Sequence, residues 1–279
     1  MEAWVNTDGP VALNEAMRYA VLDGGKRLRP LLVLAAARAC GADNSSAALR
    51  AGCSVELIHA YSLVHDDMPC MDNDVLRRGK PTVHVRYGQA QALLVGDALQ
   101  ALAFELLTAP ELDVAVQARC CAVLARAAGA SGMAGGQAMD LAHVGESMPA
   151  AVLERMHSLK TGALLEACID LGVACAQTTL SEPALQALRT YGQALGLAFQ
   201  LVDDVLDATQ DVHTLGKTAG KDADNHKPTY VTVLGLPETQ RRVQELHQLA
   251  LQALRSSDLQ DADTQPLCAI AHWVIERTH

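Results

Sequence analysis

Apolar residues recur three and four positions apart over long stretches, and this pattern constrains the fold more than any other feature. The spacing places apolar side chains on one face of an α-helix, and Ala and Leu, which dominate these stretches, are strong helix formers. The expected helices are Leu31–Cys40, Gly88–Leu107, Val114–Ala128, Ala151–Leu171 and Glu182–Ala208. Alternating patterns typical of strands are scarce, so we predict an all-α fold built as one large helical bundle.

Short runs of Gly, Pro and polar residues interrupt the helical pattern, but no stiff linker divides the chain. A length of 279 residues allows one large domain or two ordinary ones, and the near-continuous pattern favours one domain over residues 1–279. The helices are also too apolar to expose a broad face, so several should be buried nearly all round. Polar residues inside them therefore need an explanation.

The first polar exception is a cluster at the end of an apolar stretch. His59, Ser62 and Asp66 are spaced three and four apart, so they share one helix face. Pro69 ends or breaks the helix, and Asp72 can return to the same end only from non-helical backbone. The aspartates of this first cluster are Asp66, Asp67 and Asp72.

The second exception lies within the last of the expected helices. Gln200, Asp203, Asp204 and Asp207 line one face of that helix, while Leu and Val fill the other face. Adjacent carboxylates in an apolar helix repel each other and are costly to desolvate, so they persist where cations neutralise them. Carboxylates without His or Cys partners suit Mg²⁺, which also takes phosphate oxygens, so a phosphorylated ligand is implied.

One Asp-Asp pair alone is more typical of a capped or solvated helix end. Two similar clusters in apolar helices favour the metal site, and basic segments beside them strengthen it, because phosphate needs positive partners. Singly, each basic residue is better explained as a surface charge. The basic segments are Gly24–Pro30 with Lys26, Arg27 and Arg29; Arg77-Arg78-Gly79-Lys80; Lys160-Thr161-Gly162; and the later lysines Lys217, Lys221 and Lys227.

Several functions are disfavoured. A net charge of −10 and only 3% aromatic residues argue against nucleic-acid binding. Phosphate-binding nucleotide loops, dinucleotide fingerprints, serine-hydrolase elbows and zinc-protease motifs are absent from the sequence. No uncharged apolar run reaches the roughly 18 residues of a spanning helix, and no signal peptide is visible, so we expect a cytoplasmic protein without stable membrane insertion. The eight cysteines contain no Cys-x-x-Cys pair and are interpreted as buried thiols.

Taken together and in order, five segments resemble the trans-isoprenyl diphosphate synthases of the polyprenyl synthetase family, especially the bacterial farnesyl diphosphate synthase type. The resemblance runs from about Ala12 to the C-terminus. The five segments are Gly24–Pro30; Asp66-Asp67-x4-Asp72 with Arg77-Arg78-Gly79; Gly136-Gln137-x2-Asp140-Leu141; Lys160-Thr161-Gly162; and Phe199-Gln200-x2-Asp203-Asp204-x2-Asp207 with the downstream lysines.

This resemblance implies antiparallel helices around a deep central cavity, and a homodimer. The two aspartate motifs would face each other across the cavity mouth and hold three Mg²⁺ ions with an allylic diphosphate. It implies direct metal ligation by Asp66, Asp72 and Asp203, with support or water-mediated binding by Asp67, Asp204 and Asp207.

The resemblance also assigns the basic residues. Those that would hold the allylic diphosphate are Arg77, Lys160, Lys217 and Lys227. Those that would hold isopentenyl diphosphate are Lys26, Arg29, His59 and Arg78. The catalytic residues would be Lys160, with Thr161 and Gln200 beside the reacting carbon.

The implied reaction needs no nucleophilic side chain. The allylic carbon–oxygen bond ionises, the alkene of isopentenyl diphosphate attacks the cation, and a proton is then lost, with the diphosphate as its acceptor. Metals and cations stabilise the charge that develops on the leaving group. The missing catalytic triad is therefore expected.

The growing chain should point away from the metals, into the bundle. Tyr61 precedes Asp66 by five residues, about 7.5 Å along a helix at 1.5 Å per residue. In the family, bulk at this position and at the next one, here Ser62, floors the cavity. We therefore predict mainly the C15 product, farnesyl diphosphate, with C20 or C10 synthesis as the alternatives. The alternative interpretation of Tyr61 is an ordinary tyrosine packed in the core.

Three other functions compete with this one. A terpene cyclase needs one aspartate motif and an aromatic-lined pocket, which two motifs and few aromatics disfavour. A non-catalytic partner subunit should have lost one motif, and both are intact here. A head-to-head synthase of the squalene type lacks the Gly-Gly-Lys-Arg segment present at residues 24–27.

Overall fold

The computed structural model describes residues 1–5, 8–22, 24–42, 45–145, 148–176, 179–209 and 229–277. The first half of the chain contains α1 (Glu2–Val5), α2 (Val11–Leu22), α3 (Leu28–Ala39), α4 (Ser46–Asp66), β1 (Leu76–Arg77), β2 (Lys80–Pro81), α5 (Val83–Tyr87), α6 (Gln89–Leu107) and α7 (Val114–Ala128). The second half contains α8 (Met133–Ala142), α9 (Ala150–His157), the π-helix η1 (Ser158–Gly162), α10 (Ala163–Ala174), α11 (Glu182–Thr209), α13 (Tyr230–Leu234), α14 (Leu236–Arg255) and α15 (Asp261–Glu276).

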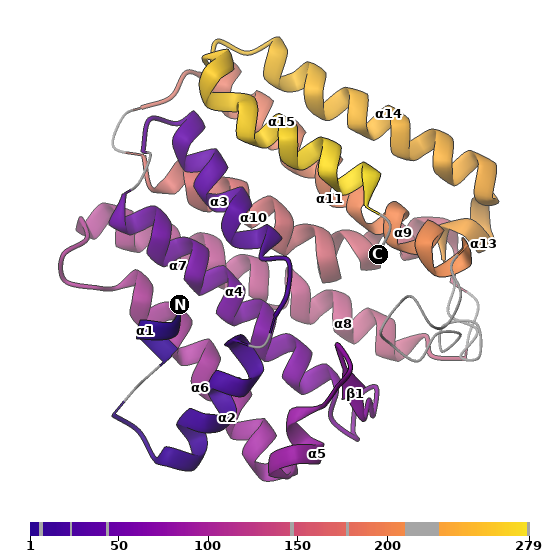
Figure 1. Cartoon of the computed structure of the whole chain (residues 1–279). Coiled ribbons are helices and arrows are strands. Elements are labelled where there is room, and N and C mark those ends of the chain that lie inside the picture. Colours follow the sequence, from indigo (N-terminus) through magenta and orange to yellow (C-terminus); the bar gives the residue numbers. More distant parts are fainter. Residues whose placement is uncertain are drawn as a thin grey trace.

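The helices pack as a bundle in which distant segments lie side by side (Figure 1). Helix α4 packs along α6, α10 packs against α3 and α7, and α14 and α15 cover α11 at one side. The largest fully buried side chains come mostly from these elements and include Leu57, Ile58, Leu99 and Ile169. The predicted all-α fold is confirmed, with one two-stranded hairpin as its β structure in the described residues.

Helix α4 begins and ends where its sequence predicts. The Ser45 hydroxyl accepts the N–H of Ala48 at 3.1 Å, which caps the first turn. The helix ends at Asp66, three residues before Pro69, and the chain then turns back. The N–H of Asp72 donates to the Asp66 carbonyl oxygen at 2.9 Å, so Asp72 returns to the helix end as predicted.

A short antiparallel hairpin follows, with Leu76 paired to Pro81 and Arg77 paired to Lys80. Its turn residues Arg78 and Gly79 have positive φ angles of 53° and 74°. Glycine adopts this conformation without steric cost, so Gly79 suits the tight turn between the two strands. The sequence pattern did not predict these two strands.

The expected helix Ala151–Leu171 is confirmed in extent but is not uniform. It is divided into α9, the π-helical turn η1 and α10. The π turn contains Lys160 and Thr161, and such turns often occur at functional sites. Gly136 of α8 lies directly against it, because an added Cβ would be 2.2 Å from the Lys160 backbone nitrogen. Close packing of α8 against η1 therefore explains the glycine at this position.

Helix α6 is long and apolar enough to cross a membrane by length and composition, but this is weak support for a span, since 44% of that window is buried in the fold. All eight cysteines are free thiols. Burial is confirmed for Cys40, Cys120, Cys168 and Cys175, but the prediction is wrong for Cys70. Cys70 is exposed because it lies in the turn after α4.

Candidate functional site

A cavity of about 400 Å³ opens between α4, α8 and η1. It brings together residues that the sequence assigned to different roles, from three separate segments. The described lining residues are Arg29, His59, Tyr61, Ser62, Leu63, His65, Asp66, Met71, Met133, Ala134, Gln137, Ala138, Leu141, Lys160 and Thr161. A basic end, a carboxylate, a π-helical lysine and an apolar wall therefore share one space, which suits a ligand with an anionic head and an apolar tail.

Asp66 is the carboxylate of the first cluster that lines this cavity. Burial raises the pKa of Asp66 to about 6, while the nearby Lys160 ammonium lowers it and Asp72 raises it. The desolvated carboxylate is therefore a group whose negative charge a bound cation would stabilise. Lys160 itself is held by Asp140 of α8, with Nζ 2.6 Å from the carboxylate oxygen. The acidic residue of the Gly136–Leu141 segment thus positions the lysine of η1.

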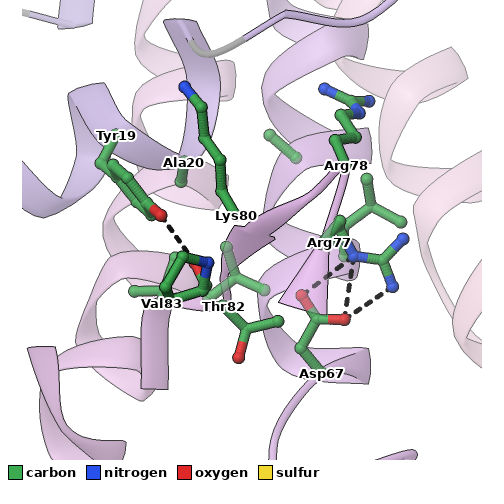
Figure 2. Close-up of a pocket in the computed structure, with 12 residues that line it drawn as sticks. Tyr19, Ala20, Asp67, Arg77, Arg78, Lys80, Thr82 and Val83 are labelled. Atoms are coloured by element: carbon green, nitrogen blue, oxygen red, sulfur yellow. Dashed lines mark hydrogen bonds and ion pairs between the residues drawn. The ribbon is translucent and has the colours of Figure 1, made fainter. Parts of the chain in front are cut away.

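Asp67 points to the other side of α4, where Arg77 holds it (Figure 2). The Nε of Arg77 donates to both carboxylate oxygens at 2.9 Å, and Nη2 donates to one of them at 2.6 Å. Burial raises the pKa of Asp67, and the hydrogen bonds and charge of Arg77 oppose that rise. This ion pair fastens the hairpin to the end of α4.

Arg78 and Lys80 extend away from Asp67 in the same view. The guanidinium of Arg78 lies against the loop before α3, since an added Cβ on Gly25 would be 2.9 Å from its Nη1. Figure 2 also shows the Tyr19 hydroxyl donating a hydrogen bond, which reaches the Pro81 carbonyl oxygen at 2.7 Å. The hairpin therefore turns one arginine inward to Asp67 and the other toward the Gly24–Pro30 segment.

Three of the predicted isopentenyl diphosphate residues, Arg29, His59 and Arg78, lie within electrostatic reach of one another. Burial, then the charges of Arg29 and Arg78, hold the pKa of His59 well below its usual range, so this histidine is neutral at pH 7. Burial also lowers the pKa of Arg29, and Asp203 raises it. The pKa of Lys26 is lowered by burial and by Arg277, and raised by Asp203. Asp203 of the second cluster thus faces the basic set near α3.

Asp204 of the second cluster is held by neutral donors. The Nε2 of Gln200 donates to Asp204 at 2.9 Å, and the Tyr230 backbone N–H donates to the same carboxylate at 2.7 Å. Burial raises the pKa of Asp204 to about 6, and these two hydrogen bonds lower it. The amide of Gln200 is therefore hydrogen-bonded to Asp204. Gln200 is not among the described residues that line the cavity.

Arg277, near the end of the chain, covers the second cluster. Its Nη2 lies 2.8 Å from an Asp203 carboxylate oxygen and donates to the Phe199 carbonyl oxygen at 2.6 Å. Its guanidinium also lies 3.8 Å from the centre of the Phe199 ring. Burial lowers the pKa of Arg277, while the charge of Asp203 raises it. The C-terminal segment therefore packs over α11 at the aspartates.

The donor set suits Mg²⁺ bound together with a diphosphate better than a metal bound by protein alone. Among the residues that the structure describes, no three His, Cys, Asp or Glu side chains gather into one metal-binding group. Mg²⁺ commonly uses one or two carboxylates, with waters and phosphate oxygens as its other ligands. Asp66 in the cavity and Asp203 beside α3 could supply such carboxylates from two helices.

Sequence reasoning missed several residues of this region. His65 and Met71 line the cavity, and Gln137 lines it with both amide atoms buried and without a hydrogen-bond partner in the described chain. Gln137 had a signal, since it belongs to the Gly136–Leu141 segment, but His65 and Arg277 had none. The predicted Lys217 and Lys227, and also Lys221, lie outside the described residues.

The sequence was also compared with known families and proteins. The pattern of the Polyprenyl synthetase family matches residues 10–264. The farnesyl diphosphate synthase of Escherichia coli is 45% identical over 94% of this chain and 88% of its own. Geranylgeranyl pyrophosphate synthase 4 of Arabidopsis thaliana is 42% identical over 97% of this chain and 72% of its own.

Solved structures agree with the sequence comparisons. The geranyltransferase of Helicobacter pylori, complexed with magnesium and isoprenyl diphosphate, superposes with a TM-score of 0.82 at 33% identity, covering 97% of this chain and 88% of that one. The family pattern spans most of the described fold, including both aspartate clusters, the hairpin and the π-helical turn. The chain therefore belongs to the polyprenyl synthetase family.

Proposed function

We propose that the protein is an Mg²⁺-dependent prenyltransferase that condenses isopentenyl diphosphate with dimethylallyl or geranyl diphosphate. The observation that carries this proposal is the cavity in which Asp66, Lys160, His59 and Tyr61 meet. An anionic head at the carboxylate end and a prenyl tail toward the tyrosine would use every part of that lining. The similarity to farnesyl diphosphate synthases supports the same reaction class.

In this mechanism, the residues of the site bind two diphosphates and orient their carbon chains. Lys160, Arg77 and the lysines after α11 would hold the allylic diphosphate, while Lys26, Arg29, His59 and Arg78 would hold isopentenyl diphosphate. The allylic carbon–oxygen bond breaks and its electron pair leaves with the diphosphate. The alkene then forms the new carbon–carbon bond, and the lost proton goes to the diphosphate. Thr161 would lie beside the reacting carbon, and Asp140 keeps Lys160 directed at the site.

Mg²⁺, when bound, would offset the negative charge of the leaving diphosphate. We propose Asp66, Asp72 and Asp203 as direct ligands, with Asp67, Asp204 and Asp207 in support. The hydrogen bonds that hold the buried Asp67 and Asp204 support their place in this division, whereas Asp203 would exchange its ion pair with Arg277 for the metal. The proposed number is three ions, and the magnesium complex of the Helicobacter pylori relative supports use of this metal.

We propose farnesyl diphosphate, C15, as the main product. Tyr61 lines the cavity five residues before Asp66, where a large ring would stop a growing chain. Geranylgeranyl diphosphate, C20, is the second candidate, because plant geranylgeranyl pyrophosphate synthases are 42–44% identical to this chain.

We also propose a cytoplasmic homodimer with one domain per chain. Helix α6 supports the dimer, since it exposes the two neighbouring leucines Leu93 and Leu94, at 48% and 53%. A second copy packed on α6 would remove this surface from water and explain the composition of the helix.

The deciding experiment incubates the pure protein with Mg²⁺, labelled isopentenyl diphosphate and either allylic starter, and sizes the products. We expect C15, and a sedimenting mass of two chains in the same preparation. A cyclic hydrocarbon product would favour a terpene cyclase, and a C20 product would overturn the proposed product length. If the protein elongates nothing, either alone or mixed with another prenyl diphosphate synthase, the proposed enzymatic function is wrong.

A further inference from the structure

The ring of His65 rests in a notch on helix α6 that exists because residue 96 is glycine. An added Cβ on Gly96 would lie 1.9 Å from His65 Nε2 and 2.5 Å from both neighbouring ring carbons, Cδ2 and Cε1. Nε2 also lies 3.2 Å from the Leu93 carbonyl oxygen, which can only accept, so this nitrogen carries the proton in that bond. The imidazole is therefore bounded on one side by the backbone of α6.

The other side of His65 faces the cavity, next to Tyr61. The two rings lie one helical turn apart on α4, with centres 5.8 Å apart at 72°, an edge-to-face arrangement. Burial raises the pKa of the Tyr61 hydroxyl, and the nearby Gln100 side chain lowers it. Gly96 and Gln100 are four residues apart, so both lie on one face of α6, beside the rings of His65 and Tyr61.

We propose that Gly96 and His65 form a pair that sets product length, in addition to Tyr61. This inference rests on the proposed prenyltransferase function and deepens it, because the ligand concerned is the growing prenyl tail. Gly96 allows the His65 ring to lie against α6, which leaves space in the cavity beside Tyr61. The residue at position 96 acts only through His65 and is a positioning residue.

Opposite changes at the two positions should move product length in opposite directions. A methyl group at position 96 displaces the imidazole, and the cavity is the side on which α6 does not confine it, so the space for the tail shrinks. Removal of the imidazole by His65→Ala extends the cavity toward α6, so the space grows. One methylene more or less in an apolar pocket changes the discrimination between two substrates by about tenfold or more. Because a prenyl unit contains five carbons, a change in the space for the tail should alter the product ratio by at least this factor.

The experiment compares wild type, Gly96→Ala, His65→Ala and the double variant, each with Mg²⁺, labelled isopentenyl diphosphate and geranyl or dimethylallyl diphosphate. We expect Gly96→Ala to raise the C10 to C15 product ratio about tenfold, and His65→Ala to raise the C20 to C15 ratio similarly. The double variant should match His65→Ala, because the three atoms nearest to the added methyl group have gone.

Gly52→Ala is the matched control, a glycine-to-alanine change on α4 itself. Its added Cβ would meet Pro30 at 3.4 Å, an ordinary contact outside the cavity, so the product ratio should stay unchanged. Unchanged ratios in His65→Ala and Gly96→Ala, with melting temperatures near wild type, would overturn the inference. If Gly96→Ala does not fold, an unchanged C20 to C15 ratio in His65→Ala alone overturns it.

A binding measurement separates this inference from the proposed function. Calorimetry with geranyl and farnesyl thiolodiphosphates, which resist ionisation, needs no turnover. Gly96→Ala should weaken the longer analogue about tenfold relative to the shorter one. If the wild type elongates nothing, the proposed function fails, and equal weakening of both analogues would show separately that the pair does not set tail length.

Discussion

Asp67 of the first cluster and Asp204 of the second are both buried, and each directly follows another aspartate. Asp67 is held by a cation, the guanidinium of Arg77. Asp204 is held by neutral donors, the Gln200 amide and the Tyr230 backbone N–H. Burial raises the pKa of both carboxyls, and for Asp204 it reaches about 6 despite its two hydrogen bonds.

The difference concerns where each cluster obtains its positive charge. The first cluster carries a built-in counterion on the hairpin, so Asp67 serves to fix the fold near Asp66. The second cluster receives its counterion from Arg277 at the far end of the chain, on the neighbouring Asp203. We infer that the first cluster keeps its shape by itself, whereas the second depends more on the C-terminal segment and on bound cations.

The largest expected effect comes from two of the aspartates proposed as direct metal ligands, one from each cluster. Asp66→Ala and Asp203→Ala should each lower kcat/KM about a thousandfold, because losing a metal ligand removes several kcal/mol of charge stabilisation in the transition state. Steady-state kinetics in saturating Mg²⁺ measure this, and circular dichroism checks folding. Asp261→Ala, an exposed aspartate at the start of α15, should retain wild-type activity. Near-normal turnover in either cluster variant would remove that aspartate from the metal site.

The second prediction concerns stability and distinguishes the charged partner of Asp67 from the neutral hydrogen-bond donors of Asp204. Arg77→Ala leaves the buried Asp67 without its counterion and should lower the free energy of unfolding by about 3 kcal/mol. Gln200→Ala removes one neutral donor while Tyr230 remains, so about 1.5 kcal/mol is expected. Urea unfolding without Mg²⁺ gives both values.

A charge-neutral change tests the reason for that difference. Asp67→Asn added to Arg77→Ala should recover part of the lost stability, because the unpaired buried charge is gone. If Arg77→Ala and Gln200→Ala lose the same stability, or if the double variant recovers none, the charge of the hydrogen-bonding partner does not determine the stability.

Local spacing was enough to predict half of this site. The shared face of His59, Ser62 and Asp66 follows from three- and four-residue periodicity, and all three line the cavity. Pro69 likewise predicted the helix end and the return of Asp72. These predictions succeeded because the interactions involved lie within a few residues along one helix.

The remaining features depend on contacts between distant segments, which spacing does not encode. Arg277 reaches Asp203 only after α14 and α15 have packed against α11. The π turn at Lys160 has the sequence pattern of an ordinary helix, and Gly136 of α8 packs directly against it. The Tyr230 N–H that donates to Asp204 also comes from a separate helix, 26 residues further along the chain.

The smallest predicted effect tests the hydrogen bond from Tyr19 of α2 to the hairpin beside the first cluster. Tyr19→Phe removes the hydroxyl that donates to the Pro81 carbonyl oxygen but keeps the ring, over which Arg86 lies at 4.3 Å. Pro81 is exposed, so water can replace the donor, and the loss should be about 0.5–1 kcal/mol, or a few degrees in Tm.

Kinetics of the same variant distinguish positioning from general stability. If the bond orients the hairpin, KM for the diphosphates should rise a few-fold while kcat stays near wild type, since Arg77 and Arg78 are on that hairpin. Tyr87→Phe is the control, because its ring packs edge-on to Tyr19 at 5.5 Å and keeps that contact after the change. Equal KM values in Tyr19→Phe and wild type would show that the Asp67–Arg77 pair alone fixes the hairpin, which would make the first cluster still more self-contained than the second.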